Sequence, residues 1–276
     1  MKHLSTTISV GAEAPFTLLH MSDTHLAMAD MRDDQRKIEL SERRMRRFPE
    51  NLNMLAAGEK LAREKGLTIV HTGDLIDFVS YANLEEAKRF TDENDCFMAA
   101  GNHEFSLYVG EAVEDAAYRN LSLERVQASF KNDIRFSSRV INGVNLVAID
   151  NSYYLFETQQ LEGLKQEVAK GLPILLLMHT PLYSQGLFEH MMVGRKESSA
   201  GIMSVPADKM MNYDPDEFIQ QRADEITRQA YEYITTTPQI KAIITGHLHF
   251  NYEDWVTPTL PQYITDCTTL RELCIR

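Results

Sequence analysis

The sequence predicts an α/β fold with a mixed sheet system, and three observations lead to it. Short apolar runs alternate along the chain with stretches of helical character. The runs lack a regular apolar–polar alternation and are too short for core helices, which is typical of strands buried on both faces. The pair Asn142–Gly143 between two β-rich runs predicts a hairpin, so the sheet system includes an antiparallel pair.

Buried strands are expected where the apolar runs lie. The five runs are residues 16–22, 67–72, 96–100, 173–178 and 240–245. The hairpin is expected within residues 134–149. After Gly246 we expect further short strands, with turns at Pro258 and Pro261.

Helices are expected between the strands, because start and stop signals stand there. The signals are Pro49 and Gly66 for one helix, Asn83 with Glu86 as a capping box for another, Thr158 and Gly171 for a third, and Asp214–Pro215 for a fourth. In the fourth, apolar positions keep a helical period from Phe218 to Ile234, which predicts a helix over that range.

Composition and charge narrow the class of protein. The chain has 276 residues, of which 43% are hydrophobic, and is expected to form a single domain over residues 1–276. Its 40 acidic and 28 basic residues give a formal net charge of −12, which disfavours nucleic acid and anionic membrane as partners. The three cysteines form no C-x-x-C pair, and neither a signal segment nor a membrane-spanning run is present. A cytoplasmic protein is expected, with an oligomeric state that the sequence leaves open.

Metal-capable side chains follow each of the five predicted strands. They are Asp23 and His25, Asp74, Asn102 and His103, His179, and His247 and His249. A single histidine after one strand is usually a satisfied buried residue, but five coincident strand ends argue against that interpretation. Because ligand sites of open α/β sheets gather at the carboxyl ends of the strands, we expect these side chains to meet at one edge.

The expected site would favour anionic substrates. Asp23 and Asp74 supply two carboxylates, and neutral imidazole and amide ligands add no charge, so two divalent cations would keep an excess of positive charge. Nitrogen and oxygen ligands without thiolate favour Mn, Fe, Zn, Co or Ni. An Asp that bridges cations about 3.5 to 4 Å apart would form a clamp for the attacking and leaving oxygens of an in-line phosphoryl displacement.

Five motifs, in order, carry a resemblance to a known family. They are D-T-H at 23–25, G-D-L-I-D at 73–77, G-N-H-E at 101–104, the lone His179, and G-H-L-H at 246–249. The set resembles that of the calcineurin-like metallophosphoesterases and extends over about four fifths of the chain. The resemblance implies a four-layer α/β/β/α sandwich of two mixed β-sheets, with a dinuclear metal centre at one edge.

The resemblance also implies a role for each motif residue. One cation would be held by Asp23, His25, Asp74 and His249, and the other by Asp74, Asn102, His179 and His247, so that Asp74 bridges them. A water between the cations, its pKa lowered, would attack phosphorus. His103 would stay free to stabilise the transition state or to protonate the leaving oxygen. Asp77 would orient His103, the alternative being an ordinary turn or helix-cap aspartate.

Departures from other branches of the family narrow the expected substrate. Ala100 and Phe78 stand where the protein Ser/Thr phosphatases have arginines. His25 and Asp77 stand where the purple acid phosphatases have Asp and Tyr. What remains resembles the bacterial branch that hydrolyses small phosphodiesters or phosphomonoesters. Two alternatives stay open: a nucleotide pyrophosphohydrolase, and a scaffold that keeps the fold without the chemistry.

Residues outside the motifs leave more than one interpretation open. The irregular stretch 181–213 carries five methionines and either folds over the metals as a lid insertion or forms a surface or dimer contact. In the first case, His190 and Arg195 would contact substrate. The run Arg43, Arg44, Arg46 and Arg47 either grips phosphate or pairs with nearby acids. Tyr153 and Tyr154 either stack on a substrate or pack in the core.

Overall fold

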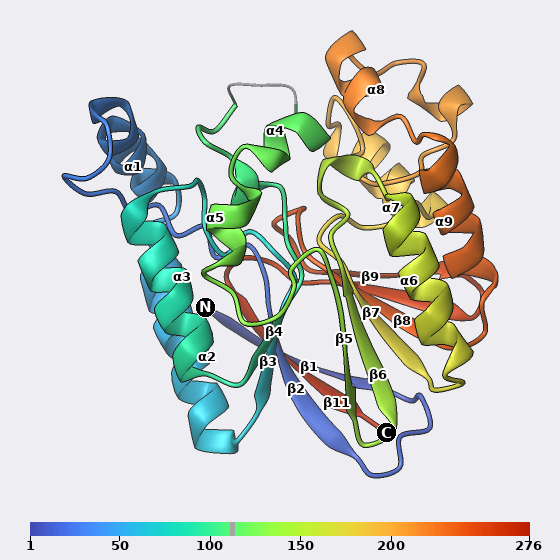
Figure 1. Ribbon diagram of the computed structural model, residues 1–276. Coiled ribbons are helices and arrows are strands. Elements are labelled where there is room, and N and C mark those ends of the chain that lie inside the picture. Colours follow the sequence, from blue (N-terminus) through green and yellow to red (C-terminus); the bar gives the residue numbers. More distant parts are fainter. Residues whose placement is uncertain (111–113) are drawn as a thin grey trace.

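Two β-sheets pack face to face at the centre of the structure, with helices on both outer sides (Figure 1). The computed structural model describes residues 1–110 and 114–276. Within these residues one sheet has the order β1 (Lys2–Ile8), β11 (Thr269–Ile275), β2 (Phe16–Met21), β3 (Thr68–His71) and β4 (Cys96–Met98). The other has the order β5 (Phe136–Ile141), β6 (Val144–Ile149), β7 (Ile174–Leu177), β8 (Ile240–Thr245), β10 (Leu260–Ile264) and β9 (Tyr252–Thr257).

Helices flank the two sheets. On the side of the first sheet lie α1 (Gln35–Arg47), α2 (Asn51–Lys65) and α3 (Tyr81–Glu93). On the side of the second lie α6 (Thr158–Ala169) and α9 (Glu225–Thr236) (Figure 1). Shorter helices in the connections are α4 (Ala116–Asn120), α5 (Leu123–Gln127), α7 (Gln185–Glu189) and α8 (Pro215–Gln221). Both sheets mix parallel and antiparallel pairs, so the predicted four-layer α/β/β/α sandwich is confirmed.

Three apolar layers hold the sandwich together, and the alternation of side chains along each strand assigns residues to them. In β2, Leu18 belongs to the cluster between the sheets, whereas Leu19 packs toward α2 and α3. In β7, Leu175 faces the other sheet and Leu176 packs toward α6 and α9. Strands of this kind are buried on both faces, which explains their continuous apolar runs.

The predicted strands and the hairpin are confirmed. The five apolar runs contain β2, β3, β4, β7 and β8, and the tail forms β9, β10 and β11. The turn at Pro258 is confirmed, but the turn at Pro261 is wrong, because Pro261 lies in β10. Asn142 and Gly143 have φ angles of 46° and 75° and join the antiparallel strands β5 and β6. Two successive left-handed residues are what a two-residue type I′ turn requires, which is why this pair predicted the hairpin.

Two helix predictions are wrong in detail. The cap of α3 is Ser80, whose hydroxyl accepts from the backbone N–H of Asn83, so Asn83 lies inside the first turn. The stretch from Asp214 to Ile234 forms two helices, because Asp224 caps a new one by accepting from the N–H of Thr227. An Asp side chain that bonds the backbone in this way ends the preceding helix while leaving the apolar period intact.

The parallel strands carry their carboxyl ends to a common edge of the sandwich. In the first sheet β2, β3 and β4 run parallel, and in the second β7 and β8 do. Each of the five is followed within a few residues by one of the motifs singled out from the sequence. Among the described residues no helix combines the length and apolar character needed to cross a membrane.

Candidate metal centre

Left-handed backbone conformations are concentrated at this edge. Asp23, His25, Asp74, His247 and His249 have φ angles of 55°, 50°, 55°, 71° and 52°. Such angles are uncommon outside glycine and cost about 1–3 kcal/mol each when the surrounding structure enforces them. Each turns the chain sharply just after a strand. Backbone strain that is concentrated at aspartate and histidine residues indicates a functional site.

Two glycines let the motif loops approach each other. A Cβ on Gly246 would lie 1.8 Å from Ser22 Oγ and 2.3 Å from Asp23 Oδ2. A Cβ on Gly101 would lie 2.3 Å from Asp74 Oδ1. The carboxylates of Asp23 and Asp74 therefore occupy the space that a larger residue would need.

The side chains on one side of the edge converge closely enough to share an ion. His249 Nε2 lies 3.4 Å from Asp23 Oδ1 and 3.0 Å from His25 Nε2. His25 Nε2 also lies 3.7 Å from Asp74 Oδ2. Asp23, His25 and His249 form one of the clusters in which all candidate ligand atoms lie within 4.8 Å of one another.

A second group of side chains meets on the other side of Asp74. His179 Nε2 lies 3.1 Å from Asp74 Oδ2, and 3.1 Å from His247 Nδ1. Asp23, Asp74 and His179 form another cluster within the 4.8 Å limit, as do His25, Asp74 and His103. Asp74 thus touches both groups.

The donor set fits divalent cations. Asn102 Oδ1 is buried and has no hydrogen-bond partner among the described residues. Buried polar atoms normally have a partner, so this side-chain oxygen is available to bind a cation. Burial lowers the pKa of His25, and lowers that of His247 to about 3, so both rings are neutral as metal ligation requires. Burial would also lower the pKa of His179, but the charge of Asp74 raises it to about 10, so a cation bound there would displace the proton of that ring. Burial would raise the pKa of Asp74, but the charges of His179 and His103 hold it well below its usual value.

A match to a family of known proteins agrees with this geometry. The family model of the calcineurin-like phosphoesterases matches residues 16–251. The chain belongs to the calcineurin-like phosphoesterase family. It is therefore a hydrolase that acts on phosphoric ester bonds, and the resemblance seen in the motifs is confirmed.

Solved structures similar to this phosphoesterase come from several organisms. A dimetal phosphatase from Danio rerio is 13% identical with a TM-score of 0.47, the match covering 91% of this chain and 87% of that one. Phosphopantetheinyl hydrolase from Mycobacterium tuberculosis is 11% identical with a TM-score of 0.44, covering 91% and 90%. A 5′-nucleotidase from Candida albicans is 14% identical with a TM-score of 0.42, covering 92% and 46%, so this chain spans about half of its length. The search of curated proteins gives no match.

Asp77 contacts two histidines of the phosphoesterase site. Its Oδ1 lies 2.8 Å from His25 Nδ1 and 3.3 Å from His103 Nδ1. The backbone carbonyl of Asp77 lies nearer to His103 Nδ1, at 2.8 Å. Burial would raise the pKa of Asp77, but hydrogen bonds from His25 and Arg44 hold it at about 2. The carboxylate expected to orient His103 is thus shared with His25, and the carbonyl takes the closer contact with His103.

Arg44 is the member of the arginine run that reaches this site. Its Nε and Nη2 donate to the two carboxylate oxygens of Asp77 at 2.5 and 2.7 Å. Its guanidinium also lies 5.1 Å from the ring centre of Phe48, which stacks on His25 with ring centres 4.3 Å apart. One interpretation of the arginine run was that it pairs with acidic residues nearby in the sequence. Arg44 does pair with an acidic residue, but that residue, Asp77, lies 33 positions away.

Glu104 joins the loops that carry Asp74 and Asn102. Its carboxylate accepts from the N–H groups of Asp74 and Leu75 at 2.7 and 2.6 Å, and from that of Gly101 at 2.6 Å. Burial raises its pKa to about 8. Removing this acceptor would leave several buried N–H groups without a partner.

Sequence reasoning missed Asn151 and Thr72, which support the site, and gave Tyr154 only a stacking or a packing role. Asn151 Oδ1 accepts from the N–H groups of His179 and Thr180, both at 3.0 Å, and so fixes the end of β7. The carbonyl of Thr72 lies 2.7 Å from His179 Nδ1. Tyr154 Oη lies 3.0 Å from His247 Nε2. Asn151 follows a strand end like the motif residues, which is the one signal that could have identified it.

The stretch 181–213 packs as a folded unit beside the G-H-L-H loop. Leu187, Met191 and Ile202 are among the buried residues of its own apolar cluster, against which Leu248 packs. His190 stacks on Tyr252 with ring centres 4.7 Å apart. Arg195 lies 4.7 Å from the ring centre of Phe250 and donates to Glu197. Within the part of the chain that the structure describes, neither His190 nor Arg195 contacts a candidate ligand.

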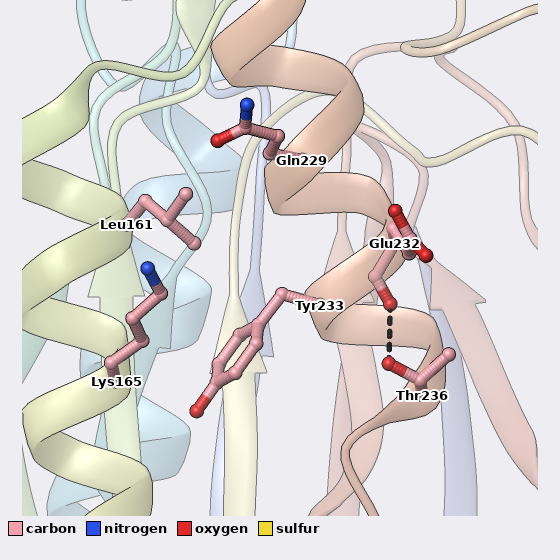
Figure 2. A pocket seen from close by; sticks show the side chains of 6 residues that line it. All are labelled: Leu161, Lys165, Gln229, Glu232, Tyr233 and Thr236. Atoms are coloured by element: carbon pink, nitrogen blue, oxygen red, sulfur yellow. Dashed lines mark hydrogen bonds between the residues drawn. The ribbon is translucent and has the colours of Figure 1, made fainter.

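A groove elsewhere on the molecule lies apart from the candidate ligands. It lies between α6 and α9, has a volume of about 320 Å³, and is lined by residues such as Leu161, Lys165 and Tyr233 (Figure 2). None of the motif residues lines it. The chemistry-bearing side chains gather instead at the strand ends.

Proposed function

We propose that this phosphoesterase holds two divalent cations and hydrolyses a small phosphodiester or phosphomonoester. In the assignment, one cation is held by Asp23, His25, Asp74 and His249, and the other by Asp74, Asn102, His179 and His247. The position of Asp74 carries the proposal, because its Oδ2 lies 3.1 Å from His179 Nε2 and 3.7 Å from His25 Nε2. Mn, Fe, Zn, Co or Ni suits this nitrogen and oxygen donor set.

The residues of the chain then act by positioning and by proton transfer. When bound, the cations would supply Lewis acidity and a water of lowered pKa. His103 is held by two contacts, since its backbone N–H donates to Asp74 Oδ1 at 2.8 Å and its ring nitrogen Nδ1 lies 2.8 Å from the carbonyl oxygen of Asp77. Because Nδ1 is engaged, Nε2 is the ring nitrogen that would reach the substrate. Its side chain is 16% exposed, so we assign His103 to stabilising the transition state or protonating the leaving oxygen.

Three further predictions from the sequence belong to this proposal. We propose that 181–213 is a lid, supported by its packing against Leu248 of the G-H-L-H loop. In that case His190 and Arg195 would have to leave Tyr252 and Phe250 to reach substrate. A cytoplasmic location, a small phosphate ester as substrate, and the exclusion of nucleic acid and membrane as partners stay predictions.

Activity of metal-free and reloaded protein tests the proposed function. After treatment with a chelator, the protein should not hydrolyse bis(p-nitrophenyl) phosphate or p-nitrophenyl phosphate, and added Mn should restore turnover of at least one of them. Analysis of nucleotide products for phosphate against nucleoside monophosphate separates ester hydrolysis from pyrophosphate cleavage. A metal-loaded protein inert toward a broad panel of phosphate esters would contradict the proposal and favour the scaffold.

A further inference from the structure

Tyr154 closes one side of the second candidate cation position. We propose that it is a positioning residue, which fixes the tautomer and the orientation of His247 so that Nδ1 of that ring faces the cation. The inference rests on the proposed function in one respect, because it takes His247 as a metal ligand. It adds a role for a tyrosine that lies outside all five motifs.

The two nitrogens of the His247 ring point to different partners. Nδ1 lies 3.1 Å from His179 Nε2, on the side where the candidate ligands converge. Nε2 lies 3.0 Å from Tyr154 Oη. The rings of Tyr154 and His247 meet edge to face, with centres 5.7 Å apart and an interplanar angle of 78°. The hydroxyl of Tyr154 therefore contacts Nε2, the nitrogen of His247 that faces away from the candidate ligands, and does not occupy the position of the cation.

Ligation then determines where the proton of His247 must be. A neutral imidazole binds a cation through its unprotonated nitrogen, so a cation at Nδ1 leaves the proton on Nε2. Nε2–H donates to the hydroxyl oxygen of Tyr154, which can accept. Removing that acceptor would let the ring rotate or take the other tautomer, and both changes withdraw Nδ1 from the cation.

Two other candidate ligand histidines, one on each side of Asp74, are held in the same way. In His25, the nitrogen Nδ1 lies 2.8 Å from Asp77 Oδ1. His179 has its Nδ1 2.7 Å from the carbonyl oxygen of Thr72. Metal-binding histidines commonly donate their second N–H to an oxygen that orients the ring. Tyr154 gives His247 the corresponding partner.

The backbone that presents Tyr154 is strained, and a buried ionic group holds it. Tyr153 and Tyr154 have consecutive φ angles of 64° and 62°. Just before them, Asp150 Oδ1 accepts from the N–H and the hydroxyl of Ser152 at 2.9 and 2.5 Å. Arg135 Nε lies 2.8 Å from the other carboxylate oxygen of Asp150. Left-handed φ angles are unfavourable for two adjacent tyrosines, so the turn is maintained by its surroundings.

Tyr154→Phe tests the proposal, and Tyr153→Phe is its matched control. The first change removes only the hydroxyl beside His247. The second removes a buried hydroxyl that has no hydrogen-bond partner among the described residues. Mn binding is measured by equilibrium dialysis and by electron paramagnetic resonance of bound Mn. We expect wild type and Tyr153→Phe to bind two equivalents tightly, and Tyr154→Phe to bind one tightly and the other about 10–100-fold more weakly. Excess Mn should then restore turnover of Tyr154→Phe.

Two results would overturn the role of Tyr154. One is Tyr154→Phe binding both equivalents with wild-type affinity. The other is measured on the wild type, with His247→Gln used only to assign the His247 signal: ¹⁵N NMR of the Zn-loaded protein would show the proton on Nδ1 in place of Nε2. A wild-type protein that binds no divalent cation would instead contradict the proposed function, so the two failures are distinguishable.

Discussion

His103 differs from the buried His25 and His179 because its side chain is 16% exposed, while its Nδ1 is held 2.8 Å from the carbonyl oxygen of Asp77. We expect His103→Ala to keep its metal and to lose about 10²- to 10⁴-fold in kcat, since a positioned proton donor typically contributes that much. Steady-state kinetics and metal analysis on the same preparation check this. His3→Ala, a change at an exposed residue of β1, serves as the control. Wild-type turnover in His103→Ala would remove His103 from the mechanism.

Arg44 neutralises Asp77, which is buried and contacts His25. Its side chain is 12% exposed and binds both carboxylate oxygens. We expect Arg44→Ala to lower the free energy of unfolding by about 1–3 kcal/mol, because a buried carboxylate loses two charged donors. Urea denaturation measures the change. Arg43→Ala, at an exposed position of the same helix, should cost less than about 0.5 kcal/mol, and equal losses in both variants would rule out the special role of Arg44.

The residues at the strand ends were the predictable part of the site. Asp74 and His179 could be brought together from the sequence because both follow strands whose ends share an edge. Arg44 and Tyr154 could not, because their partners Asp77 and His247 lie 33 and 93 residues away and no spacing rule connects them. Such contacts depend on how loops pack, and a pattern of residue types does not encode that directly.

At the scale of elements, the loop between β8 and the G-H-L-H histidines depends on Gly246. Asp23 accepts from the N–H of His247 at 3.0 and 2.9 Å, and the added methyl of Gly246→Ala would press on this carboxylate. We expect Gly246→Ala to weaken Mn binding and to destabilise the fold by about 1–3 kcal/mol.

Mn titration and urea denaturation of Gly246→Ala test that expectation. Gly194→Ala is the matched control, because a Cβ there would meet only His190 Nδ1, at an ordinary 3.6 Å. Wild-type metal affinity in Gly246→Ala would show that the close approach of the loops does not matter for the site.

Strands that are buried on both faces could be predicted from the sequence, whereas elements with an exposed face were harder to predict. The apolar runs at β2 and β7 predicted both strands. β1 was missed because its first four side chains are exposed, and it depends on backbone pairing with β11. The break between α8 and α9 was missed because the apolar period continues across it, while the cap at Asp224 stops the first helix.

At the scale of the molecule, the candidate centre joins the two sheets. Asp23 and Asp74 follow strands of the first sheet, and His179 and His247 follow strands of the second. A cation bound between them should therefore stabilise the whole sandwich, by about 2.7 kcal/mol when the ligand is at 100 times its Kd.

Thermal unfolding with Mn and with chelator measures this stabilisation. We expect saturating Mn to raise the Tm of wild type and of His103→Ala, and to have a much smaller effect on Asp74→Asn, which lacks the bridging carboxylate. An equal rise of Tm in Asp74→Asn and wild type would place the bound cation elsewhere.

The most direct measurement of the central claim is the anomalous scattering of a crystal grown with Mn. The account predicts two peaks about 3.5 to 4 Å apart, both in contact with Asp74, one beside His249 and the other beside His247. A single peak, or peaks that do not contact Asp74, would contradict it.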